Sequence, residues 1–144
     1  MKSQQVTGIL FLLLFGLLHA TLAGNITGKV KAKGVKNSAD AVIYIDSVGD
    51  KAFPPPKDHP VMDQKNLKFV PHVLPIVSGT TVDFLNSDKV LHNVFSPDNC
   101  AEKFNLGSWP QGQKKSYTFK TRGCSPVLLC NVHPEMAGYI VTLQ

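Results

Sequence analysis

Hydrophobic and polar residues alternate along much of the chain after residue 23, which is the two-residue period of a β-strand. The clearest case is residues 26–33 (ITGKVKAK). Eight further segments are short, rich in β-branched or aromatic residues and bounded by turn residues, and these are 41–45, 67–69, 73–77, 80–85, 90–95, 116–119, 127–129 and 139–143. No window of about twelve residues after residue 23 keeps a helical period. The pattern therefore predicts an all-β chain folded as a Greek-key β-sandwich.

Two longer segments interrupt this pattern and are expected to be irregular. Residues 52–63 are proline-rich and polar, and residues 99–113 contain several turn residues with a short helix or turn at 101–104. Within the second segment, Trp109 is expected in a turn that covers one end of the sandwich. Because 144 residues suit one domain and no repeat divides them, a single domain is predicted.

The first 23 residues have the composition of a signal peptide. Lys2 precedes an apolar run at 9–18 that is too short to span a bilayer, and small residues follow at 20–23. We expect cleavage after Ala23, which leaves residues 24–144 as the folded domain, periplasmic or secreted and without a stable membrane anchor. An uncleaved anchor is the less favoured alternative.

The chain carries a modest positive charge, with 15 Lys and Arg against 10 Asp and Glu. The lysines are scattered and do not alternate with aromatic residues, so nucleic-acid binding is not expected. A basic face that attracts an acidic redox partner is one interpretation, and a solvated strand face is the simpler one. Nothing in the sequence indicates oligomerisation, so a monomer is expected.

The strongest chemical signal is a Cys-x2-His-x2-Met sequence formed by Cys130, His133 and Met136. The cysteine ends a predicted strand, and a second histidine, His92, lies on another predicted strand about forty residues earlier. Two imidazoles and a thiolate with a weak axial thioether are the ligands of a type 1 copper electron-transfer site. Zinc fits the His2Cys part, but an axial thioether adds little for zinc. Catalytic copper would need an open coordination position, which four protein ligands do not leave.

Three cysteines follow the predicted signal peptide, and an odd number in an exported protein needs an explanation. One disulfide and one metal-bound thiolate is the simplest arrangement, because thiols tend to pair in oxidising compartments. A bond between Cys100 and Cys124 would close a loop of about 24 residues and stabilise the fold by about 3 kcal/mol. Pairing of either one with Cys130 stays open at this point, although it would destroy the metal site.

Residues 69–143 resemble the cupredoxin family, which includes plastocyanin, pseudoazurin and amicyanin. The resemblance rests on the ligand turn and on an upstream set of residues, namely Phe69-Val70-Pro71, Gly79-Thr80, Val82, Phe84, Asn86, Asp88 and His92-Asn93-Val94. The short Cys-x2-His-x2-Met turn, with Pro134 after the histidine, is similar to that of amicyanin. The pattern that begins at residues 62–64 resembles periplasmic cupredoxins of the methylamine-utilisation type.

The resemblance implies a role for each of these side chains. His92, Cys130 and His133 would bind one copper ion strongly, and Met136 would bind it weakly. Asn93 would tie the two ligand-bearing strands together, with its backbone N–H bonded to the ligand sulfur. An apolar docking patch would surround His133, made of Leu91, Pro97, Val132 and Pro134.

Three further side chains suggest a second metal site, namely His59, Met62 and His72. The favoured interpretation is that they are ordinary loop and surface residues. The sequence thus predicts a soluble copper protein that moves single electrons between a redox donor and an acceptor protein, and not an enzyme. The alternatives are a copper-handling protein, such as a chaperone or resistance factor, with the same ligands, and a structural zinc protein.

Overall fold

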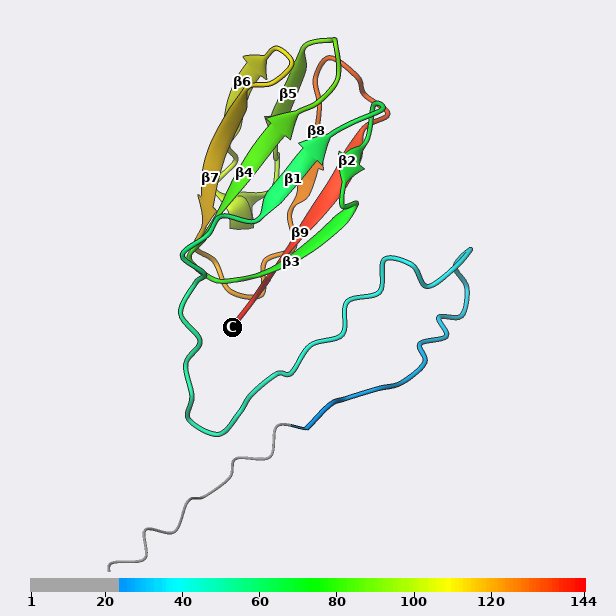
Figure 1. The fold of residues 1–144 in the computed structure, drawn as a ribbon, viewed down its shortest axis with the longest axis vertical. Coiled ribbons are helices and arrows are strands. Elements are labelled where there is room, and N and C mark those ends of the chain that lie inside the picture. The colour runs from blue at the N-terminus through cyan, green and yellow to red at the C-terminus, as the bar shows by residue number, and fades with distance from the viewer. Residues whose placement is uncertain (1–23) are drawn as a thin grey trace, which may run out of the picture. The chain divides into compact units, whose positions relative to one another are not determined.

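A computed structural model of the chain describes residues 24–144, so the predicted signal peptide lies outside the described residues. Within 24–144, nine strands form two sheets (Figure 1). The first sheet has the order β2-β1-β4-β7, with β1 at Val61–Gln64, β2 at Phe69–Val70, β4 at Thr80–Asn86 and β7 at Lys114–Phe119. The second has the order β3-β9-β8-β5-β6, with β3 at Val73–Val77, β5 at His92–Phe95, β6 at Asn105–Trp109, β8 at Val127–Leu129 and β9 at Ala137–Leu143.

The predicted all-β sandwich is confirmed. The strand pairs β1–β4 and β3–β9 are parallel, and the other pairs are antiparallel. The only helical element among the described residues is the short 3-10 helix η1 at Asn99–Ala101. No helix in this part of the chain is long and apolar enough to cross a membrane.

Two predicted strands are wrong. The chain divides at residue 30 into two units, and neither residues 24–30 nor residues 31–60 contain a strand. The apolar side chains that suggested strands at 26–33 and 41–45, such as Ile26 and Ile43, are mostly exposed. An alternating segment becomes a strand only when a neighbour supplies hydrogen-bond partners and a face to bury, and neither segment has a strand partner.

Two strands occur where irregular chain was predicted. β1 begins inside the proline-rich segment, and its alternation is hidden because the buried face carries Gln64 beside Met62. β6 is held by pairing with β5, which aligns Trp109 with His92, so Trp109 is a buried strand residue and not a turn residue. Leu67, expected beside Phe69 on one face, is instead an exposed turn residue with a left-handed φ of 56°.

The core lies between the inward faces of the two sheets. Its largest fully buried apolar side chains are Trp109, Phe69, Phe84, Met62, Leu128, Met136 and Ile140. β2 lies close to β9 at Gly138, where an added Cβ would lie 2.7 Å from the Cβ of Phe69. A glycine is therefore required at this crossing, because any side chain would collide with the buried phenyl ring.

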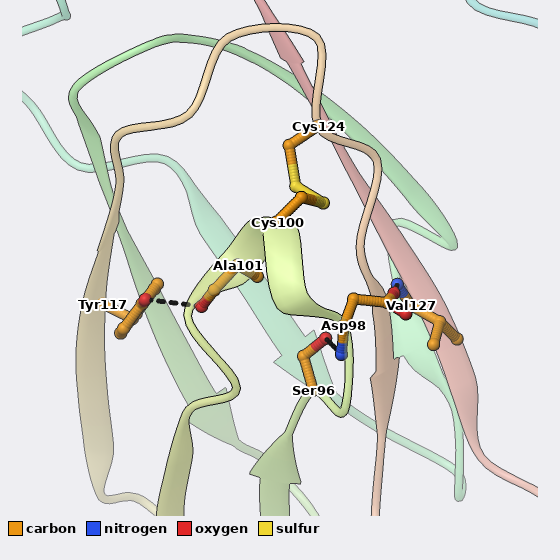
Figure 2. The surroundings of a disulfide bond; sticks show 7 residues. All are labelled: Ser96, Asp98, Cys100, Ala101, Tyr117, Cys124 and Val127. Atoms are coloured by element: carbon orange, nitrogen blue, oxygen red, sulfur yellow. Dashed lines mark hydrogen bonds between the residues drawn. A yellow bond between two sulfur atoms is a disulfide. The ribbon is translucent and has the colours of Figure 1, made fainter.

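A disulfide joins Cys100 in η1 to Cys124 in the connection before β8, with a Cα–Cα distance of 5.7 Å (Figure 2). This confirms the predicted pairing and leaves Cys130 as a free, buried thiol.

Candidate metal centre

The candidate ligands meet because β5 and β8 are neighbours in the five-stranded sheet. His92 is the first residue of β5, and Cys130 directly follows β8. His133 lies in the turn between β8 and β9, where its carbonyl accepts a hydrogen bond from the Met136 N–H at 3.0 Å. Short-range turn geometry and one long-range strand pair therefore bring these residues to the same end of the sheet.

Three donor atoms face one another at this end. The Nδ1 atoms of His92 and His133 are 3.1 Å apart, and they lie 3.8 and 3.9 Å from the Sγ of Cys130. With metal–nitrogen bonds of about 2.0 Å and a metal–sulfur bond of about 2.3 Å, a trigonal plane separates the nitrogens by about 3.5 Å and each nitrogen from sulfur by about 3.7 Å. The spacing therefore fits one metal ion, and these three residues form a group among the described residues that could hold one.

The site is shielded from solvent to different degrees. His92, Cys130 and Met136 are buried, whereas His133 is partly exposed. Met136 closes the ligand turn and borders a surface cleft together with Glu135 and Leu67. A metal held here would therefore be separated from bulk water, with His133 as the ligand that reaches the surface.

Asn93 links β5 to the residues that follow β8, the two segments that carry candidate ligands. Its backbone N–H donates to the Sγ of Cys130 at 3.4 Å, and its side-chain oxygen accepts the N–H of Asn131 at 3.3 Å. Its amide nitrogen donates to the side chain of Asn105 at 2.9 Å and to the carbonyl of Gly107 at 3.0 Å. The predicted role of Asn93 as a bridge between the strands is thus confirmed.

Solved structures of copper proteins share this fold. A reduced mutant form of amicyanin matches with a TM-score of 0.56 and 24% identity, over 62% of this chain and 91% of that one. The Cu(I) form of a second amicyanin mutant matches with a TM-score of 0.55 and 26% identity, over 58% and 81%. A purple cupredoxin from Nitrosopumilus maritimus matches with a TM-score of 0.52 and 24% identity, over 58% and 98%. The chain has the cupredoxin fold.

A copper-containing nitrite reductase from Thermus scotoductus SA-01 also matches, with a TM-score of 0.56 and 28% identity over 68% of this chain. The matched region spans only 25% of that enzyme's length. Related domains therefore occur within a larger enzyme as well as in small proteins. No protein-family model and no curated protein sequence matches the chain.

Asp88 is a site residue that the sequence reasoning quoted only as part of a family pattern. Its Oδ2 lies 2.9 Å from the Nε2 of His92, which holds the imidazole with Nδ1 directed at the other donor atoms. The same carboxylate accepts the N–H groups of Asn66 and Leu67, at 2.7 and 3.0 Å. Burial works to raise the pKa of Asp88, but the hydrogen bonds from Leu67, His92 and Asn66 outweigh it and lower the pKa. In the sequence, the signal for this contact was a carboxylate four residues before a candidate ligand histidine.

The four residues of the predicted docking patch are all exposed, with Leu91 at 53% and Val132 at 47% of full exposure. Exposed apolar side chains beside the partly exposed His133 suit contact with another protein. The patch thus has the exposure that docking requires.

The three residues considered for a second metal site do not form a common cluster in the structure. His59 lies 3.0 Å from the carboxylate of Asp83, and Met62 is fully buried in the core. The ring of His72 contacts Tyr139 edge-on, with centroids 5.5 Å apart. Each of the three residues thus has an ordinary structural environment.

Proposed function

We propose that this chain is a cupredoxin that binds one copper ion through His92, Cys130 and His133, with Met136 as a weak axial ligand, and carries single electrons between redox proteins. The observation that carries the proposal is the spacing of two imidazole nitrogens and one thiolate sulfur at 3.1 to 3.9 Å. This donor set is the one that selects copper for electron transfer. The structural matches support it, since matching amicyanin structures are described as Cu(I) forms.

Copper would supply a one-electron couple at this site, and the chain's own residues would set its environment. The N–H of Asn93 stabilises negative charge on the Cys130 sulfur, and Asp88 fixes the orientation of His92. A sandwich that holds the donors in one geometry reduces rearrangement on electron gain or loss. Electrons would pass through His133, the partly exposed ligand. No substrate is changed, so the protein is not an enzyme by itself.

We also propose that the protein is exported and acts as a soluble monomer. The apolar run after Lys2 and the disulfide between Cys100 and Cys124 support this, because stable disulfides belong to oxidising compartments. A redox donor and an acceptor protein would be its partners.

The test is an optical spectrum after addition of Cu(II), followed by reduction with ascorbate and re-oxidation in air. Intense visible absorption that bleaches and returns is expected, because a thiolate-to-copper transition gives the colour. The Cys130→Ser variant should lack this band, and the matched His72→Asn variant should keep it. Weakly coloured copper, or copper lost on reduction, would instead favour the copper-handling function. Zinc retained in preference to copper would favour the structural site.

A further inference from the structure

The two strands that carry candidate ligands share very little backbone pairing. β5 and β8 are aligned at a single residue pair, Phe95 with Leu129. Strand pairs are usually held in register by several consecutive ladder bonds. The position of Cys130 relative to His92 must therefore depend on contacts beyond this short ladder.

Asp98 makes such a contact. It lies three residues after the end of β5, and its Oδ2 accepts the N–H of Val127, the first residue of β8, at 2.7 Å (Figure 2). Val127 is three residues before Cys130. If β5 continued, one of its backbone carbonyls would accept the Val127 N–H. The chain instead turns into η1, and the Asp98 carboxylate takes the place of that carbonyl. A hydrogen bond to a charged acceptor is stronger than a neutral one.

Asp98 is itself held in place by η1. Its N–H donates to the hydroxyl of Ser96 at 3.3 Å, and its carbonyl accepts the N–H of Ala101 at 3.1 Å. The hydroxyl of Tyr117 donates to the carbonyl of Ala101 at 2.8 Å (Figure 2). The Cys100–Cys124 disulfide then ties η1 to the segment that leads into β8. These contacts therefore hold the Asp98 carboxylate in a fixed position.

We propose that Asp98 is a positioning residue of the metal centre. It fixes the position of Cys130 relative to His92 by holding Val127 against the end of β5. The effect on bound copper rests on the proposed function. The effect on Val127 does not, because that contact exists whether or not a metal is present.

The experiment compares Asp98→Ala, Asp98→Asn and Tyr117→Phe with the wild-type chain. In Asp98→Ala, release of copper to a chelator should be about tenfold faster, the lower end of the range for groups that support metal ligands. The visible band should also shift, because the Cys130 sulfur moves. Asp98→Asn keeps an acceptor oxygen and should restore both properties to near wild type. Tyr117→Phe removes one hydrogen bond to η1 and keeps the contact between Asp98 and Val127, so its spectrum should lie closer to wild type than that of Asp98→Ala.

Hydrogen exchange of the Val127 amide in the metal-free protein provides the independent measurement. It should be faster in Asp98→Ala and near wild type in Asp98→Asn. If Asp98→Ala cannot be purified folded, Asp98→Ser replaces it, since the shorter side chain cannot reach Val127. A wild-type spectrum and release rate in Asp98→Ala would overturn the proposal, as would an Asp98→Asn variant no better than Asp98→Ala. If the wild-type protein takes no coloured copper, the proposed function fails, while the exchange result still decides whether Asp98 holds β8.

Discussion

The backbone N–H of Asn93 donates to the sulfur of Cys130 at 3.4 Å, so the residue after one candidate ligand contacts the donor atom of another. Because the donor is a backbone group, its position depends on where the Asn93 side chain anchors the strand. That side chain bonds Asn131 on one side and Asn105 and Gly107 on the other.

Replacement of Asn93 by Ala should lower the free energy of unfolding by about 3 kcal/mol, since three partly buried hydrogen bonds are lost at about 1 kcal/mol each. Urea titration of the metal-free protein measures this. The control is Ser108→Ala, an exposed position that faces Asn93 across the β5–β6 pair. Equal stability of the two variants would show that the bridge contributes nothing.

Replacement of Asp88 by Ala should weaken copper binding by about 10- to 100-fold, the usual effect of removing a carboxylate that orients a ligand histidine. His92 loses its Nε2 partner, and the turn at Asn66 and Leu67 loses its acceptor. Competition with a copper chelator measures the affinity. Lys89→Ala, an exposed neighbour, should bind copper like wild type. An unchanged affinity in Asp88→Ala would show that His92 is oriented by packing alone.

Replacement of Met136 by Leu should leave copper bound and raise the reduction potential. Loss of a weak axial donor disfavours Cu(II) more than Cu(I), because the more highly charged ion gains more from a donor. Leu is close to Met in volume, so the buried position should stay packed. Redox titration followed by optical absorption measures the potential. Complete loss of copper would mean that Met136 is more than a weak ligand.

Stability should depend on pH through Asp83, a buried carboxylate on β4. Burial alone would raise its pKa, but hydrogen bonds from Lys114, Ser116 and His59 outweigh burial and lower the pKa to about 2 from 3.8. Since the folded state holds the proton less tightly than the unfolded state, this stabilisation is present above pH 3.8. It is lost as pH falls toward 2.

The Asp83→Asn variant tests this dependence. It should be less stable than wild type by about 2 kcal/mol near pH 6, as the fall in the pKa of Asp83 implies. The difference should shrink below about pH 4 and vanish near about pH 2. Thermal unfolding of the metal-free proteins across this range measures it. A difference that stays constant with pH would rule out the ionised carboxylate as its source.

The fold class followed from sequence wherever a strand's own residues alternate or form a short apolar run. β3 and β8 have the predicted bounds, and β4, β5, β7 and β9 differ from prediction by two residues or fewer at either end. The failures have one cause. β1 and β6 carry weak patterns and exist because β4 and β5 pair with them, whereas residues 26–33 have a strong pattern and no strand partner.

The sequence by itself determined the candidate chemistry, because donor atoms belong to residue types and the Cys-x2-His-x2-Met spacing is confined to one turn. It also pointed to the Cys100–Cys124 disulfide through the odd cysteine count. Only the tertiary structure decided which polar groups support the site. The partners of Asp88 and Asp98 lie on separate strands and turns, and hydrogen bonds of this kind form only after the sheets have brought those segments together.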